Sequence, residues 1–117
     1  MSTELPITIE TLMEQCGGMA VVAQSVLDEF LTQVATDIAE METKLAGGDL
    51  LGASKAAHRL KGTAGVLGAA KLHSLCQAVE FAGKEGRGDD AKNSFAGLKV
   101  ESQRCVDAVP AVRASVK

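Results

Sequence analysis

Apolar residues recur every three or four positions along most of the chain, and this spacing predicts helices. One long stretch of this kind runs from about Met19 to Ala46. Its apolar stripe consists of Ala23, Leu27, Phe30, Val34, Ile38, Met41 and Leu45. Gly47-Gly48 should end this helix, and Asp49 is suited to cap the next one. The stripe of that next helix consists of Leu50, Ala53, Ala57, Leu60, Ala64 and Leu67.

Shorter patterns flank these two helices. Thr8 can cap a short helix from Ile9 to about Cys16, which the glycine pair 17–18 should end. Gly68 predicts a break, followed by a fourth helix from Ala69 to about Ala82. Its inward positions are Leu72, Leu75, Cys76 and Val79.

The C-terminal part should begin with a loop, because Gly83–Gly88 is rich in glycine. Asp89 or Asp90 is expected to cap a last helix. Its inward positions are Phe95, Leu98, Cys105, Val109, Val112 and Val116. Pro110 should kink this helix or end its regular part near Ala108.

Four long segments with short connections predict an all-α fold, an antiparallel up-down-up-down four-helix bundle with a short N-terminal capping helix. The length of 117 residues, with 46% of them apolar, fits a single domain over residues 1–117. No apolar run approaches the roughly 20 residues needed to cross a membrane, and no secretory signal begins the chain. Cys16, Cys76 and Cys105 are odd in number and lie in apolar patterns, so we expect reduced core thiols and a cytoplasmic protein.

The segment from His58 to Ala69 departs from an ordinary helix, because Gly62 and Gly65 each cost roughly 0.5–1 kcal/mol relative to alanine. At about 100° per residue, His58 lies roughly 120° from the middle of the apolar stripe. Lys61, Gly62 and Gly65 fall on the same side as His58. Helical side chains lean toward the N-terminus, so Gly62 leaves the imidazole uncovered and Lys61 places a cation beside it. The alternative is a surface histidine with glycines that serve helix packing.

The residues His58-x-Leu60-Lys61-Gly62, continuing to Gly65 and 67–69 (Leu-Gly-Ala), resemble the signature of histidine-containing phosphotransfer (HPt) domains. The resemblance implies a phosphorelay intermediate that shuttles a phosphoryl group between receiver-domain aspartates through a phosphohistidine at His58. It also places Glu80 where HPt domains carry Gln or Glu near the histidine. Glu80 would accept the Nδ1 proton and direct Nε2 outward, whereas the alternative is an ordinary solvated glutamate.

The same resemblance implies response-regulator receiver domains as partners, with a hybrid sensor histidine kinase as a further one. We expect a monomer without its own cofactor, because Mg²⁺ would belong to the receiver. No P-loop or kinase signature is present, so we expect a phosphocarrier without autokinase activity. The net charge of −3 argues against nucleic-acid binding, and His58 and His73 lack further ligands at zinc-site spacing.

Charge along the chain is uneven. From Leu50 to Val79 there is no Asp or Glu, yet the segment contains Lys55, Arg59, Lys61 and Lys71. This predicts a basic patch around His58 that attracts an acidic partner site, although a chance run on a solvated surface would look the same.

Met19, Val22 and Val26 extend the apolar character of the long helix beyond its main stripe. The favoured interpretation is that the short N-terminal helix covers them, and the alternative is an exposed docking patch. The competing function is a non-catalytic helical interaction module, for instance a degenerate HPt domain, that uses the same bundle surface to bind a receiver or kinase domain without phosphotransfer.

Overall fold

The structure is a computed structural model that describes residues 5–116. Within these residues it contains five helices and no strand. They are α1 (Ile9–Gln15), α2 (Ala20–Ala46), α3 (Leu50–Val66), α4 (Ala70–Lys84) and α5 (Gly88–Ser115).

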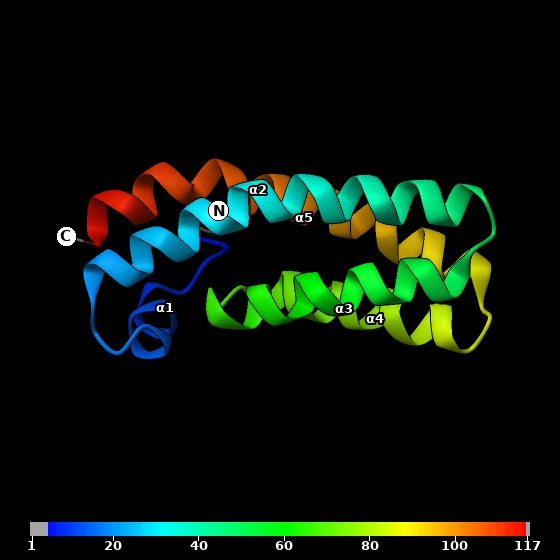
Figure 1. Ribbon diagram of the computed structural model, residues 1–117, viewed down its shortest axis with the longest axis horizontal. Coiled ribbons are helices and arrows are strands. Elements are labelled where there is room, and N and C mark those ends of the chain that lie inside the picture. Colours follow the sequence, from blue (N-terminus) through cyan, green and yellow to red (C-terminus); the bar gives the residue numbers. More distant parts are fainter. Residues whose placement is uncertain (1–4, 117) are drawn as a thin grey trace.

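Helices α2 to α5 form the predicted antiparallel four-helix bundle. Figure 1 shows α2 and α5 on one side of the molecule and α3 and α4 on the other. Each helix packs against its neighbour in the chain, and α5 returns to α2. The all-α up-and-down architecture is therefore confirmed.

The predicted stripes form the core. All the apolar positions predicted to face inward on α3 and α5 are buried, apart from the half-buried Leu50. On α2 and α4 the exceptions are Ile38 and Leu75, which are half-buried and pack against the core. Burying such side chains contributes roughly 1.5–3 kcal/mol each for Val, Leu or Phe, which outweighs weak local propensities. Asp49 caps α3 as expected, accepting a hydrogen bond from the Gly52 N–H at 2.9 Å.

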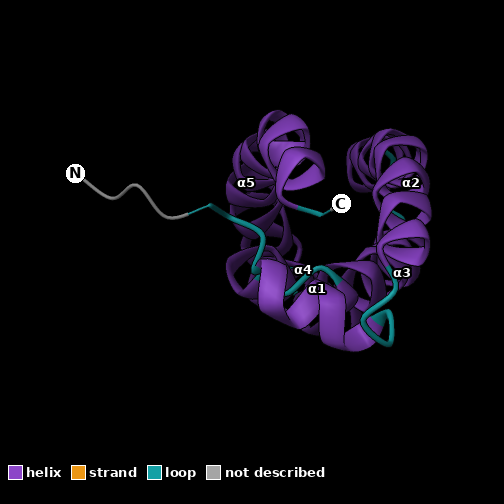
Figure 2. Ribbon diagram, turned by 90° about the vertical axis from the view of Figure 1, so that its left-hand side faces the viewer, coloured by secondary structure: helices purple, strands orange, loops and turns teal. Residues whose placement is uncertain are grey.

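Helix α1 lies across the end of the α3–α4 pair (Figure 2). The Thr8 N–H donates to the carbonyls of Leu67 and Gly68, both at 3.2 Å. Thr8 occupies the N-cap position of α1, but its side chain makes no capping hydrogen bond. It packs instead against Gly68, where a Cβ would lie 2.8 Å from the Thr8 Cβ. The predicted helix start is right and the predicted cap bond is wrong.

The prediction of a loop over Gly83–Gly88 is largely wrong, because α4 continues to Lys84 and α5 already begins at Gly88. Gly83 is a buried helical residue, and a Cβ there would lie 2.6 Å from the Leu50 carbonyl oxygen. Glycine at this position allows α4 to approach the first turn of α3. Only residues 85–87 connect the helices, and Gly86 makes the turn with φ 73°.

The predicted cap of the last helix is also wrong. Arg87 is the N-cap residue of α5, and Asp89 and Asp90 lie in the first turn. Carboxylates are favourable there because they face the positive end of the helix dipole. Arg87 also pairs with Asp90 at 2.7 Å.

Pro110 does not end α5, which runs on to Ser115. The last turn is held from α2, where the Gln24 side-chain amide donates to the Arg113 carbonyl at 3.2 Å and the Val116 carbonyl at 2.6 Å. These bonds satisfy carbonyls that a helix terminus leaves without partners.

The favoured interpretation of the apolar residues at the start of α2 is wrong for two of them. Met19 is 54% exposed and Val22 is 38% exposed, whereas Val26 is half-buried against the core. Helix α1 covers the end of α3 and α4 instead (Figure 2).

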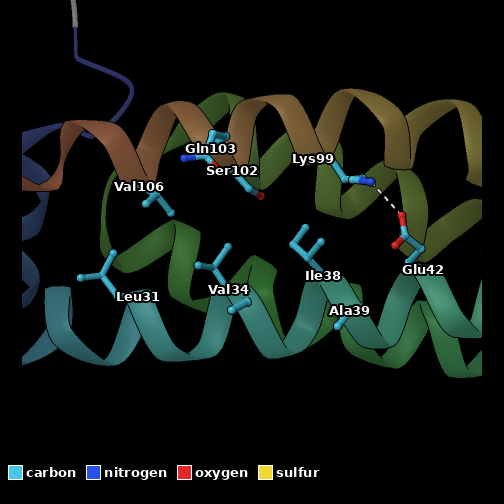
Figure 3. A pocket seen from close by; sticks show the side chains of 10 residues that line it. Leu31, Val34, Ile38, Ala39, Glu42, Lys99, Ser102, Gln103 and Val106 are labelled. Atoms are coloured by element: carbon cyan, nitrogen blue, oxygen red, sulfur yellow. Dashed lines mark hydrogen bonds and ion pairs between the residues drawn. The ribbon is translucent and has the colours of Figure 1, made fainter.

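A groove of about 490 Å³ runs between α2 and α5. Figure 3 shows its apolar walls, with Leu31, Val34 and Ile38 facing Val106. The Lys99–Glu42 ion pair, at 2.7 Å, spans it at one end. The buried Ser102 hydroxyl, which also lines the groove, has no hydrogen-bond partner within residues 5–116.

Cys16, Cys76 and Cys105 are free and buried, as predicted. Burial raises the pKa of the Cys76 and Cys105 thiols to about 12. Between residues 5 and 116, no helix is long and apolar enough to cross a membrane.

Candidate functional site

His58 lies on the outer face of α3, with its side chain 66% exposed. Its neighbours Ala57 and Leu60 are fully buried, which fixes the rotation of the helix and points the imidazole away from the core. The exposed position predicted from the helical spacing is confirmed.

Glu80 reaches the same place from α4. It is only 2% exposed, and its Oε2 lies 2.8 Å from the His58 Nδ1. The register of the two helices is fixed beside it, because the buried Ser54 hydroxyl donates to the Glu80 carbonyl at 2.9 Å. The structure thus brings His58 and Glu80 together, and Glu80 is not an ordinary solvated glutamate.

Two lysines complete the cluster around the Glu80 carboxylate. The Lys61 Nζ lies 2.6 Å from Oε1, and the Lys84 Nζ lies 3.1 Å from Oε2. Burial would raise the pKa of Glu80, but the hydrogen bonds from Lys61, Lys84 and His58 outweigh it and lower the pKa to about 2.

The ionised state of Glu80 determines the tautomer of His58. A carboxylate can only accept hydrogen bonds, so the His58 Nδ1 must carry the hydrogen at this 2.8 Å contact. In the neutral ring the lone pair is then on Nε2. The arrangement presents a nucleophilic nitrogen on the outside of the bundle.

The two glycines of the motif differ in their surroundings. A Cβ at Gly62 would have no atom within 4 Å, so the space beside it is open. A Cβ at Gly65 would meet the His73 Cδ2 of α4 at 3.8 Å, which is ordinary van der Waals contact. The space at Gly62 is therefore open, as the sequence predicts. Gly65 faces the half-buried His73 of the neighbouring helix.

The predicted basic patch is largely neutralised within the chain. Arg59 pairs with Asp37 of α2 at 3.2 Å and with Glu40, and the Lys71 Nζ lies 4.0 Å from Glu101. The acidic partners come from α2 and α5. A stretch of sequence without Asp or Glu therefore does not form a surface without carboxylates. The prediction is wrong for most of these cations.

A hollow of about 390 Å³ adjoins the imidazole. It is lined by Ser54, Lys55, His58, Arg59, Glu80 and Lys84. Lys84 was not predicted as a site residue. The spacing of four residues from Glu80 on one helix is the signal that could have identified it.

Among residues 5–116, no group of three or more His, Cys, Asp or Glu side chains is placed to hold a metal ion. The chemistry that this site can perform with its own groups is nucleophilic attack by an oriented imidazole, with lysine ammonium groups nearby to offset negative charge.

Comparison with known proteins agrees with this geometry. The sequence pattern of the Hpt domain matches residues 25–114. The fold is similar to the crystal structure, at 1.80 Å, of the HPT domain from the Hpt sensor hybrid histidine kinase of Shewanella, with a TM-score of 0.83. The two chains share 20% sequence identity over 96% of this chain and 97% of the other. No match is found among curated proteins.

The matched segment includes α3, α4 and most of α2 and α5, and therefore every residue of the histidine cluster. It spans well over half of the 117 residues. The chain belongs to the Hpt domain family, whose members transfer phosphoryl groups in two-component phosphorelays.

Proposed function

We propose that His58 is the phosphoacceptor of this Hpt domain, taking a phosphoryl group from a receiver-domain aspartate and passing it to another. The observation that carries the proposal is the exposed imidazole whose Nδ1 is bound to the buried Glu80 carboxylate at 2.8 Å. In a ring held in this way Nδ1 is bound to Glu80, which leaves Nε2 as the nucleophile of a largely exposed side chain.

The transfer needs no proton from this chain. The Nε2 lone pair forms the N–P bond while the P–O bond of the donor aspartyl phosphate breaks. The electron pair of that bond returns to the donor carboxylate. Phosphoryl transfer depends mainly on positioning and charge compensation, so an oriented nucleophile is an adequate contribution from one partner.

Each neighbour of His58 has a role in this proposal. Glu80 orients the ring and fixes its tautomer. Lys61 supplies positive charge close to the ring, and the open space at Gly62 admits the donor. Gly65 keeps the adjoining turn of α3 free of a side chain, beside His73.

The partners in this proposal are receiver domains, with a hybrid sensor histidine kinase as a further one. Mg²⁺ would be held by the receiver, and this chain would act as a monomer in the cytoplasm without ATP or autokinase activity. The exposed Met19, which is the N-cap residue of α2, and Val22 in the first turn offer apolar surface for docking.

The competing proposal is a degenerate Hpt domain that only binds its partner. A module that only binds its partner would not need a buried carboxylate that orients the histidine through its Nδ1. Burying a carboxylate costs free energy unless it is fully paired, and here three cations or N–H donors surround it. This arrangement favours phosphotransfer.

The test uses a receiver domain phosphorylated with acetyl phosphate and measures acid-labile phosphate on this chain. The wild type and a His73→Gln control should both accept phosphate, and His58→Gln should keep its helical circular dichroism and accept none. Acceptance by His58→Gln would refute the assignment of His58, and no acceptance by the wild type from any of a panel of receivers would favour the degenerate module.

A further inference from the structure

The cationic side chains near His58 differ in whether they already form ion pairs with carboxylates of this chain. Lys61 is 21% exposed and contacts the Glu80 carboxylate at 2.6 Å. Arg59 is bound to Asp37 and Glu40 on α2. Lys84 is 57% exposed but also lies on Glu80, at 3.1 Å.

Lys55 is the exception. It is exposed, and among residues 5–116 no carboxylate lies within the 4.0 Å of an ion pair to it. The pKa of the Asp49 carboxyl is lowered mainly by the hydrogen bond from the Gly52 N–H. The charge of Lys55 makes the smallest of several contributions.

Lys55 is also correctly placed. It precedes His58 by three residues on α3, a spacing at which helical side chains are neighbours. Both residues line the hollow of about 390 Å³, whereas Lys61 and Gly62 do not. The concave surface next to the imidazole is therefore on the Lys55 side of the ring.

Lys55 is better suited than Lys61 to bind a phosphoryl dianion, because Lys61 already neutralises the buried Glu80 carboxylate. If Lys61 left Glu80 for the phosphoryl group, a carboxylate that is 2% exposed would lose its closest cation. Removing one partner from a buried ion pair is costly. Lys55 can bind the phosphoryl oxygens without breaking any contact within the described chain.

We propose that Lys55 is a catalytic residue that contacts the phosphoryl oxygens during transfer to and from His58, an inference that rests on the proposed function. Its ammonium group donates hydrogen bonds to the non-bridging oxygens and keeps its protons. The bonds made and broken are those of the transfer itself, N–P formation at Nε2 and cleavage of the bond from phosphorus to the leaving group.

Phosphoramidate is a suitable donor for the test because it carries a phosphoryl group and no protein surface. In this reaction the P–N bond of the donor breaks and ammonia leaves. The initial rate of phosphate incorporation at His58 is compared among the wild type, Lys55→Gln, Lys55→Arg and Lys92→Gln. Lys92 is the matched control, an exposed lysine on α5 outside the hollow.

We expect Lys55→Gln to slow phosphorylation about tenfold, the scale of one exposed charge-assisted hydrogen bond. Lys55→Arg should retain most of the rate and Lys92→Gln all of it. The thermal midpoints should coincide, because Lys55 is exposed and makes no ion pair within residues 5–116. A purely structural role would not distinguish glutamine from arginine in this way.

An unchanged rate for Lys55→Gln with phosphoramidate would overturn the inference, and so would an equal loss in Lys92→Gln. A loss seen only with a phosphorylated receiver would also overturn it, because Lys55 would then contact the partner protein and not the phosphoryl group. None of these three results affects the proposed function, which fails separately if wild-type His58 takes up no phosphate from either donor.

Discussion

At the scale of single residues, Gly62 is the position where stability and function are most clearly opposed. The surroundings of this helical glycine would accept a Cβ without any contact under 4 Å, and its φ is negative. Packing therefore gives no reason for glycine here. The space matters because it lies one turn beyond His58, where a longer side chain would lean back over the imidazole.

Two substitutions separate these effects. Gly62→Ala should raise the free energy of unfolding by roughly 0.5–1 kcal/mol, because alanine is the better helix former and meets no obstacle. Gly62→Gln should block phosphoryl acceptance while helicity is retained. Urea denaturation and the receiver-transfer assay measure the two outcomes, and normal transfer by Gly62→Gln would disprove the steric role.

The sequence is informative about His58, Lys61 and Gly62 because helical periodicity fixes which side of a helix each residue occupies. Glu80 is indicated by the resemblance to HPt domains and not by periodicity. The sequence is less informative about which cation near His58 is left without an ion pair, because that depends on contacts between helices. The spacing of Lys61 from His58 predicts a cation beside the imidazole, but it does not reveal that Glu80 of another helix binds this cation. Lys55 has the same spacing on the other side of His58 and remains unpaired in the described chain.

At the scale of elements, the α3–α4 pair supports the site. Ser54 bonds to the Glu80 carbonyl, and Gly83 allows close approach at Leu50. A glycine-rich segment usually indicates a loop, so the sequence predicts a loop that includes Gly83. Sequence alone does not reveal that a glycine serves a close contact with a residue more than thirty positions earlier. The sequence also predicts Asp89 or Asp90 as the cap, because aspartate is favoured both at the N-cap and in the first turn of a helix.

The pairing of Glu80 across α3 and α4 predicts a specific response to acid. The pKa of this carboxyl is about 2 in the folded protein, against 4.5 for an ordinary glutamate. Between these values the unfolded chain binds a proton that the folded chain does not. The contribution to stability is therefore complete above pH 4.5 and is lost as the pH falls toward 2, by up to about 3 kcal/mol.

Urea denaturation of the wild type and Glu80→Gln at several pH values tests this response. The other carboxylates are common to both proteins, so the difference between the two free energies isolates Glu80. The difference in the free energy of unfolding should shrink as the pH falls from 5 to 2, because the wild type loses stability over this range. Parallel curves over this range would contradict the account.

At the scale of the whole molecule, the bundle was predictable because its long amphipathic stripes and short connections leave few alternatives. The position of α1 was not, since seven residues can cover either α2 or the end of α3 and α4. Thr8, the N-cap residue of α1, contacts Leu67 and Gly68 and so holds α1 at the α3–α4 end, while Met19 and Val22 remain exposed.

Folding also rearranges the charge of the molecule. Asp37, Glu40 and Glu101 lie far from the basic stretch in sequence and beside it in space. What remains around His58 is a smaller positive surface made by Lys55 and Lys84 at the hollow. Long-range pairing of this kind is set by the packing of α2 and α5 on the α3–α4 pair, which periodicity does not encode.

The most direct test of His58 as the phosphoacceptor is ¹⁵N and ³¹P NMR of histidine-labelled protein after phosphorylation by a receiver domain. We expect phosphorus bound to Nε2 of His58, a hydrogen retained on Nδ1 facing Glu80, and an unmodified His73. Phosphorus on Nδ1 of His58, on His73 or on no histidine at all would contradict this assignment.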